Sequence, residues 1–321
     1  MNAKKLLLGF LAGATLAASA HAAYPERPIT VVVPFPAGGS SDAIARAIGP
    51  KITARFGQPW VVDNRPGATG AIGAGMVKRA APDGYTVLVA SIGVYVINQW
   101  LQKDIAYSPL RDFDLLTVAV RAPNVLVANP NVPANTVQEL IAQLKKNPGK
   151  ITFASAGNGS SDHLTAELFW QKSGTSGVHV PYKGGAPAIT DLLGGQTDVS
   201  FVNINTALPY LKTGRLKALA VTGEARAAIL PKVPTLTEAG VPGVDIYSWQ
   251  GIAAPKGLPK DVKAKLHEAI VAALQEPELK HRLVEQGFEV VANTPEQFEK
   301  FQASEQARWK SVIETGKITA D

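Results

Sequence analysis

The chain has 321 residues, enough for two domains of ordinary size, and its 32 basic and 26 acidic residues give a formal net charge of +6. The composition is not that of a disordered segment or a coiled coil, and the charge is too small to indicate nucleic-acid binding. The chain has no cysteine, which excludes disulfides, thiolate metal sites, cysteine nucleophiles and a lipidated N-terminal cysteine.

Residues 1–22 have the pattern of a secretory signal peptide. Lys4 and Lys5 precede an apolar run, and Ala20-His21-Ala22 forms an A-x-A cleavage site. The run is shorter than the ~20 residues that a transmembrane helix needs, and no later segment is long or apolar enough to span a membrane. Cleavage after Ala22 removes two of the 32 basic residues and no acidic one, which leaves a mature charge of 30 − 26 = +4. We therefore expect a periplasmic protein that is neither lipidated nor inserted in the membrane.

Residues 30–46, TVVVPFPAGGSSDAIAR, predict a buried strand, a tight turn and a helix. The three valines suit a strand covered on both faces, and the prolines end it because they lack a backbone donor. The glycines let the backbone approach a ligand, while the serines and the aspartate are expected to cap the helix, so that its first N–H groups point into the bend. This is an anion-binding geometry. The candidate ligand-binding residues are Phe35, Ala37, Gly38, Gly39, Ser40, Ser41 and Asp42.

A second copy of this pattern lies at residues 151–169, ITFASAGNGSSDHLTAELF. Gly159-Ser160-Ser161-Asp162 repeats Gly39-Ser40-Ser41-Asp42 after another short strand. A histidine in the first turn of the predicted helix can donate to a bound anion. Two such loops in one chain suggest a clamp. The candidate residues here are Ser155, Ala156, Gly157, Asn158, Ser160, Ser161 and His163.

Strands alternate with helices along the rest of the chain, which predicts an α/β protein with mainly parallel sheets covered on both faces. Two short strands, at residues 115–120 and 125–128, are separated by a proline-containing link that suits a crossing between lobes. Residues 247–254 are expected to return the chain to the first lobe. Helices are then expected at residues 262–274, 277–285 and 295–314.

Four further residues follow predicted strands and are candidates for the same pocket: Ser91, Tyr95, Tyr182 and Asn203. For Tyr95, a place in the hydrophobic core is an equally good interpretation. A glycine series at residues 67–75 does not have the G-x-G-x-x-G spacing of a dinucleotide site, and close helix packing explains it better.

The sequence lacks the strong catalytic signatures. There is no H-E-x-x-H, no Gly-Lys-Ser/Thr ending a glycine-rich loop, and no G-x-S-x-G elbow. The loop serines are better explained as caps and ligand donors than as nucleophiles. We expect a binding protein without metal or cofactor, and keep an exported hydrolase that uses Ser41 or Ser160 as an alternative.

Two anion-binding loops are sufficient for a carboxylate receptor. Hydrogen bonds to a charged acceptor contribute roughly 1.5–3 kcal/mol each, and a helix end adds roughly 0.3–1 kcal/mol. A micromolar ligand needs only about −8 kcal/mol in total. Phe35, Tyr95, Tyr182 and Trp249 are candidate walls for an apolar spacer, although Trp249 is at least as well explained as a core residue.

The chain resembles the Bug-type periplasmic solute-binding proteins of tripartite tricarboxylate transporters. The segments that carry the resemblance are YPERPITVVVPFPAGGSSDAIAR, VVDNRPGATGAIGA, PDGYT, FASAGNGSSDHL and VPYKGGAPAITDLLGGQTDVSF, and the likeness covers essentially the whole mature chain. It implies a monomeric type II, Venus-flytrap receptor whose sheets are joined by two crossing strands. Lobe 1 would comprise residues 23–122 and 252–321, and lobe 2 residues 123–251.

The resemblance also implies a function: capture of a small carboxylate between the lobes, partly through ordered water, and delivery to a pair of membrane permease subunits. A sensor that passes its closed state to a histidine kinase is the alternative. Many relatives read F-D-N where this chain has Phe201-Val202-Asn203. If that acid holds an amino group, an amino-acid ligand is disfavoured here, and a dicarboxylate or an aromatic carboxylate is preferred.

Overall fold

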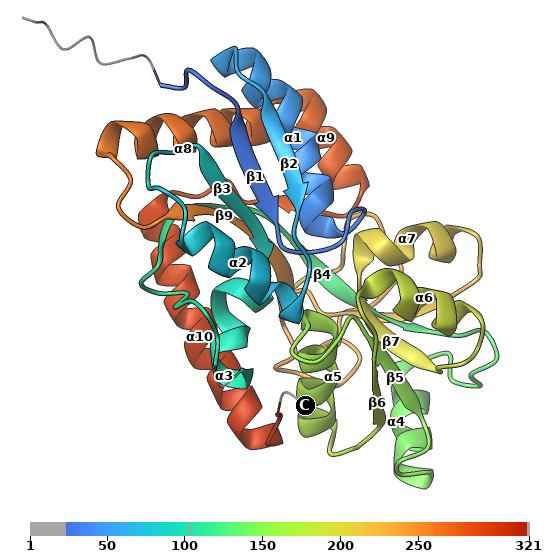
Figure 1. Ribbon diagram of the computed structural model, residues 1–321. Coiled ribbons are helices and arrows are strands. Elements are labelled where there is room, and N and C mark those ends of the chain that lie inside the picture. Colours follow the sequence, from blue (N-terminus) through green and yellow to red (C-terminus); the bar gives the residue numbers. More distant parts are fainter. Residues whose placement is uncertain (1–23, 103, 320–321) are drawn as a thin grey trace, which may run out of the picture.

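The computed structural model describes residues 24–102 and 104–319 and contains two groups of strands joined in one mixed sheet (Figure 1). The strand order is β2-β1-β3-β9-β4-β7-β5-β6, and both β10 and β8 also pair with β4. The expected signal peptide, residues 1–22, lies outside the described residues. No helix within residues 24–102 and 104–319 is long and apolar enough to cross a membrane.

The first group of strands forms the sheet of lobe 1. β1 pairs in parallel with β2 and β3, and β9 is antiparallel to β3 and to the first part of β4. The strands are β1 (Ile29–Val33), β2 (Trp60–Asn64), β3 (Thr86–Ser91), β4 (Phe113–Ala128), β9 (Tyr247–Pro255) and β10 (Glu289–Val290). The surrounding helices are α1 (Ser40–Phe56), η1 (Ala68–Gly70), α2 (Ala71–Lys78), η2 (Gly93–Ile97), α3 (Asn98–Leu101), α8 (Lys260–Gln275), α9 (Pro277–Glu285) and α10 (Pro295–Gly316).

The second group forms lobe 2 around the other end of β4. β5 pairs in parallel with β6 and β7, while β7 and β8 are antiparallel to β4. Its strands are β5 (Thr152–Ser155), β6 (Val178–Pro181), β7 (Val199–Asn203) and β8 (Lys217–Val221). Its helices are α4 (Val137–Lys146), α5 (Ser161–Ser173), α6 (Gly185–Leu193) and α7 (Ile204–Lys212).

One strand, β4, runs through both lobes, which corrects the prediction of two separate strands. Its pairing with β9 ends at Pro123, opposite Tyr247, and its pairing with β7 begins at Asn124, opposite Asn203. Pro123 lacks a backbone donor, but it stands where the ladder changes partners, so the strand continues through it. The proposed lobe boundaries remain a prediction.

Two hydrophobic clusters cover the two faces of the sheet, and each includes residues of both lobes. On one face, Tyr95 stacks on Trp249 at 5.8 Å between ring centroids, and Phe298 of α10 meets both rings edge-on. On the other, Ile44 and Ile48 of α1 belong to the cluster that contains Val31 and Val33 of β1, whereas Val32 lies in the first cluster. Side chains alternate along a strand, so both faces need apolar residues.

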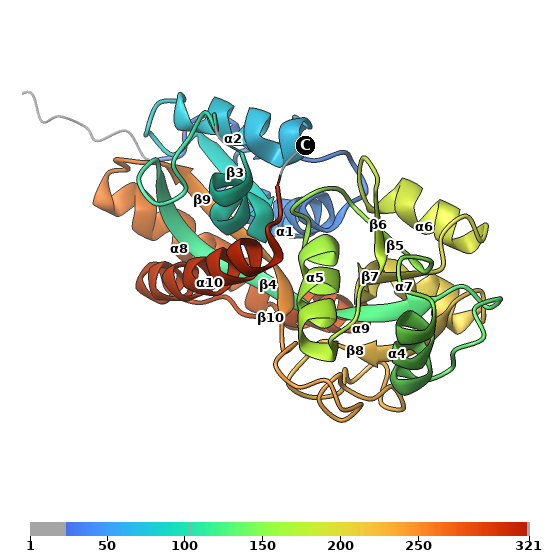
Figure 2. The ribbon, with the colours of Figure 1, turned by 90° about the horizontal axis from the view of Figure 1, so that it is seen from below.

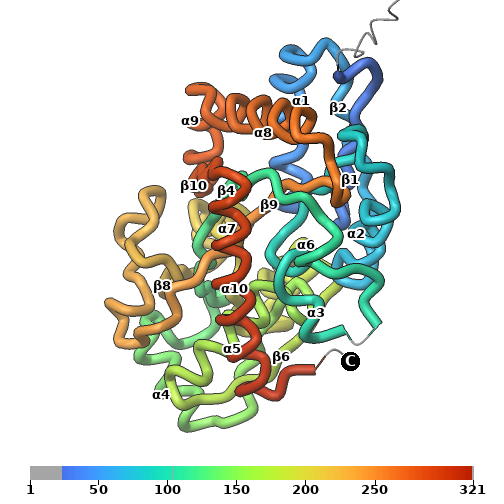
Figure 3. Tube along the Cα trace, turned by 90° about the vertical axis from the view of Figure 1, so that its left-hand side faces the viewer, coloured from blue at the N-terminus to red at the C-terminus, as the bar shows by residue number. Residues whose placement is uncertain are grey.

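The C-terminal helix links the lobes. From below, α10 lies beside α5 of lobe 2 (Figure 2), and the side view shows α10 running down toward α5 (Figure 3). The Gln171 side-chain amide donates to the Val312 carbonyl at 3.2 Å. The described conformation therefore has its lobes in contact.

Candidate ligand-binding site

The loop between β1 and α1 ends at a helix N-terminus that no side chain within residues 24–102 and 104–319 caps. Gly39 is the N-cap residue, in an extended conformation, and Gly38 has φ of +88°. The expectation that Ser40, Ser41 and Asp42 cap this helix was wrong, because all three lie inside the first turn. The first-turn N–H groups of a helix have no intrahelical partners. Here they form a positive, donor-rich end next to the exposed residues of the loop.

Asp42 holds the first loop together. Its carboxylate accepts hydrogen bonds from the Gly38 backbone N–H at 2.9 Å, from Arg46 Nε at 3.0 Å and from Asn64 Nδ2 at 3.0 Å. Burial raises the pKa of Asp42, but these three donors outweigh it and hold the pKa below the usual value. Asp42 is therefore a charged residue of the loop framework, and its charge is balanced by Arg46.

The β5–α5 loop has a related organisation. Ser160 is the N-cap residue of α5, as expected, and its hydroxyl accepts from the His163 N–H at 3.2 Å. Asp162 accepts from the Ala156 N–H at 3.1 Å and from the Ser161 hydroxyl at 3.1 Å. No cation replaces Arg46 at the equivalent position, which is Ala166. Burial therefore dominates and raises the pKa of Asp162 to about 6.

Two histidines, His163 and His179, pack against each other and form hydrogen bonds with residues of this second loop. The rings of His163 and His179 are stacked, with centroids 3.7 Å apart and planes 3° from parallel. His163 Nδ1 accepts from the Gly159 N–H at 3.1 Å, and His179 Nε2 lies 2.6 Å from the Ser155 hydroxyl. His163 and Ser155 are both buried, so they shape the loop from behind instead of lining its surface.

The two lobes meet at a polar contact that we call the interlobe seam: Ser40, Asn203, Asn205 and Ser248. The Ser40 hydroxyl lies 3.3 Å from Asn203 Oδ1 and 3.5 Å from Asn205 Oδ1. Ser248 of β9 donates to Asn203 Oδ1 at 3.4 Å, and Asn203 Nδ2 donates to Asn124 Oδ1 at 2.6 Å. The seam thus joins the N-termini of α1 and α7 to the two strands that connect the lobes.

The remaining predicted residues differ from one another in how deeply they are buried. Phe35 and Tyr182 are half-buried, and the Tyr182 hydroxyl donates to Asp191 at 2.7 Å. Ser91 is half-buried at the end of β3. Tyr95 is fully buried, and its hydroxyl donates to the carbonyls of Leu88 and Gly251 at 3.3 and 3.2 Å. The structure therefore supports the interpretation of Tyr95 as a core residue. Trp249, which stacks on it, is a core residue as well.

Sequence reasoning missed Asn124, Asn205 and Ser248. Asn124 is completely buried, and its amide donates to Thr165 of α5 at 3.0 Å. The signal for Asn124 is a polar side chain that is buried inside the continuous strand β4. Within residues 24–102 and 104–319, no group of three or more histidine, aspartate or glutamate side chains could hold a metal ion.

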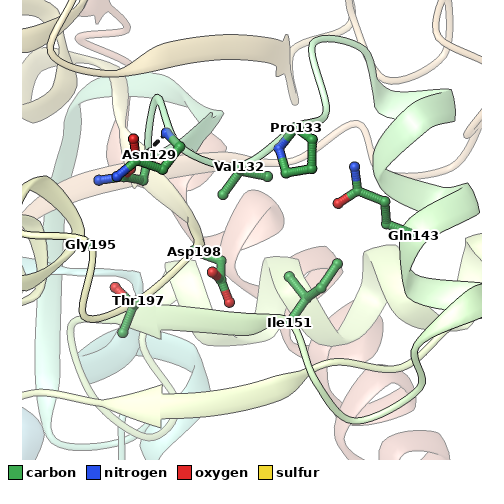
Figure 4. A pocket seen from close by; sticks show the side chains of 9 residues that line it. Asn129, Val132, Pro133, Gln143, Ile151, Gly195, Thr197 and Asp198 are labelled. Carbon is green, nitrogen blue, oxygen red and sulfur yellow. Dashed lines mark hydrogen bonds between the residues drawn. The ribbon is translucent and has the colours of Figure 1, made fainter.

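Two surface hollows lie away from the seam. One, of about 150 Å³, is bordered by Ile151 and Asp198, which directly precede β5 and β7 (Figure 4). It is therefore at the amino ends of the lobe 2 strands, opposite the edge that carries the loops. The other, of about 300 Å³, adjoins β10 and includes Arg121 and Phe301. In open α/β sheets ligands bind at the carboxyl ends of strands, and the seam, unlike this first hollow, lies at those ends.

Comparison with known proteins supports a receptor. BugT of Bordetella pertussis is 38% identical over 322 residues, covering 98% of this chain and 99% of BugT. The structure of Rpa4515 of R. palustris with adipate has a TM-score of 0.89 and 34% identity, covering 92% of this chain and 99% of that one. MatC from Rhodopseudomonas palustris with bound malate has a TM-score of 0.84 and 32% identity, covering 90% and 100%.

The structure of the periplasmic binding protein BugD, with a TM-score of 0.86 and 35% identity over 93% of this chain and 100% of that one, confirms the periplasmic-binding-protein fold. Family and fold are those of solute-binding proteins and not of enzymes, which removes the hydrolase alternative. The sequence model of the family described as tripartite tricarboxylate transporter family receptor matches residues 44–318. The chain therefore belongs to the tripartite tricarboxylate transporter receptor family.

Proposed function

We propose that this protein is a periplasmic receptor that closes its two lobes on a small dicarboxylate and delivers it to a tripartite tricarboxylate-type permease. The observation that carries the proposal is the uncapped N-terminus of α1, whose Ser40 faces Asn203 at the uncapped N-terminus of α7 in the other lobe. A ligand carboxylate placed there would accept from backbone N–H groups of both lobes.

The charges around the seam suit reversible binding. Asp42 is neutralised by Arg46, and the seam itself consists of hydroxyl and amide side chains. A carboxylate held by dipoles and neutral donors does not have to leave a buried cation behind when it dissociates. Release to a permease therefore costs less than release from a buried ion pair would.

An aliphatic dicarboxylate is the ligand class that we propose. The relatives named above hold adipate and malate in their structures. Two of the four aromatic walls expected for a ring-shaped ligand, Tyr95 and Trp249, are fully buried core residues. Val202, which precedes the seam residue Asn203, is a buried apolar side chain and offers no charge to an amino group.

Calorimetry with the mature protein tests the receptor. A panel of C4 to C6 dicarboxylates, aromatic acids and amino acids should include at least one dicarboxylate that binds one-to-one and raises the melting temperature. Saturable binding of amino acids alone would overturn the ligand class. No binding across the whole panel would overturn the receptor.

Delivery to a permease is tested in cells. Deletion of the gene should abolish uptake of the radiolabelled ligand, and the protein should be recovered from the periplasmic fraction with Ala23 at its N-terminus. If uptake is unchanged while a transcriptional response to the ligand is lost, the sensor alternative is correct.

A further inference from the structure

Gln250 has a buried hydrogen-bond acceptor without a partner among the residues that the structure describes. The side chain is 2% exposed, and its Oε1 atom makes no hydrogen bond. Such orphaned acceptors are rare in native proteins, because each lost its water without gaining a donor. The residue lies on β9 between Ser91 of β3 and Val120 of β4, with which it is paired.

Strand alternation places Gln250 on the seam side of the sheet. Its neighbour Trp249 packs on the α10 face, whereas Ile252 belongs to the cluster under α1 on the opposite face. Because alternate residues of a strand point to the same face, Gln250 lies on the same face as Ile252 and Ser248. Ser248 donates to Asn203 in the seam at 3.4 Å. The unpaired acceptor therefore lies two residues along β9 from Ser248, on the same face of the sheet as this seam residue.

We propose that Gln250 contacts the ligand and selects carboxylates that carry a hydroxyl group. This rests on the receptor function proposed above. In the described conformation Ser40 and Asn203 are in direct contact, so a ligand bound between them must move them apart. Their separation would expose the polar side chains of Ser248, Gln250 and Ser91, which lie side by side on one face of the sheet. A carboxylate brings no donor to these side chains at neutral pH. A hydroxyl on the ligand chain supplies the donor that Oε1 lacks.

The polar groups around Gln250 favour a hydroxyl over an ammonium group. The seam residues Ser40, Asn203, Asn205 and Ser248 are all neutral. The acids of the two loops already accept hydrogen bonds within their own loops, Asp42 from Arg46, Asn64 and a backbone N–H, and Asp162 from Ser161 and a backbone N–H. A buried ammonium would thus lack the carboxylate that it needs, whereas a hydroxyl needs only one acceptor and one donor.

Matched pairs of acids test this role by calorimetry: succinate with malate, and glutarate with 2-hydroxyglutarate. The wild-type protein should bind the hydroxylated member of at least one pair about tenfold more tightly, the effect of one neutral hydrogen bond. Gln250→Met, with Gln250→Leu as a second variant, should keep the affinity for the unsubstituted acid and lose the preference. Their melting temperatures without ligand should be unchanged or raised, because an unpaired buried acceptor is removed.

Thr197→Val is the matched control. Thr197 is also 2% exposed, and its hydroxyl has no partner in the described part of the chain, but it lines the hollow at the amino ends of the strands. This variant should keep the preference of the wild type. The role of Gln250 is refuted if the wild type shows no preference in either pair, or if the Gln250 variants weaken both members equally. If the wild type binds none of the four acids and no other carboxylate, the receptor function itself has failed.

Discussion

Asp42 and Asp162 occupy equivalent positions, yet their replacement by asparagine should change stability in opposite directions at neutral pH. Burial raises the pKa of Asp162 from 3.8 to about 6. A carboxyl group whose pKa is higher in the folded state binds its proton more tightly there, so stability falls as pH rises between these two values. A shift of about two units corresponds to about 3 kcal/mol. Asp162→Asn should therefore raise the free energy of unfolding by up to about 3 kcal/mol at about pH 8 and change it little at about pH 4.

The same substitution at Asp42 is the control. Its pKa is lowered by Arg46, Gly38 and Asn64 despite burial. A depressed pKa stabilises the fold above the unfolded-state value, and the contribution is lost as pH falls toward the folded-state value. Asp42→Asn should therefore destabilise the protein at neutral pH, and its effect should shrink below about pH 4.

Urea unfolding at several values from about pH 3 to pH 8 measures both effects, provided that the denaturant slopes of the variants match the wild type. The reasoning is refuted if both variants destabilise the protein at about pH 8, or if the gain from Asp162→Asn is independent of pH. The asparagine retains an acceptor for the Ala156 N–H, so the loop connection itself is preserved in the comparison.

Three further predictions concern the loops and the core. Asn203→Asp places a negative charge in the seam and should weaken dicarboxylate binding about tenfold or more in calorimetry below the melting temperature. It should also lower the melting temperature, because a carboxylate cannot donate to Asn124 Oδ1 as the Asn203 amide does. Unchanged affinity would move the ligand elsewhere. Gly157 has φ of +125°, and an added Cβ would lie 3.1 Å from the Tyr182 carbonyl, so Gly157→Val should cost about 1–3 kcal/mol in urea unfolding. Gly39→Ala is its control, since the added Cβ meets only the Pro36 carbonyl at 3.7 Å; an equal cost in both variants would contradict the strain argument. Tyr95→Phe should lower stability by about 1 kcal/mol and leave ligand affinity unchanged, whereas a loss of affinity would return Tyr95 to the binding site.

The two loops could be predicted from sequence because their signals are local. Glycine, proline and serine at fixed offsets after a valine-rich strand indicate a turn into a helix, and the repeat of Gly-Ser-Ser-Asp supplied the second copy. The role of Asp42 could not be predicted in this way. Its partner Asn64 lies on β2, which the chain reaches only after the whole of α1.

Other differences also arise from long-range contacts. Proline normally ends a strand, but Pro123 stands where β4 exchanges β9 for β7, and only the assembled sheet reveals this. Tyr95 follows a strand as a pocket residue would, and its stack with Trp249 decides that it is core. Asn124 and Ser248, which lie on different strands, both contact Asn203, and nothing close to them in the sequence indicates this.

The position of β9 in the sheet has a consequence for the order of assembly. β3 ends at Ser91 and β9 begins at Tyr247, yet β9 lies between β3 and β4. Until the chain has been made past Pro255, β3 and the first part of β4 lack their shared neighbour, and the sheet cannot close. Contacts between such distant segments form slowly. We propose that this chain is exported. Because β9 comes late in the sequence, stable folding is delayed until most of the protein has been synthesised, and the unfolded chain can still pass through a narrow secretion channel.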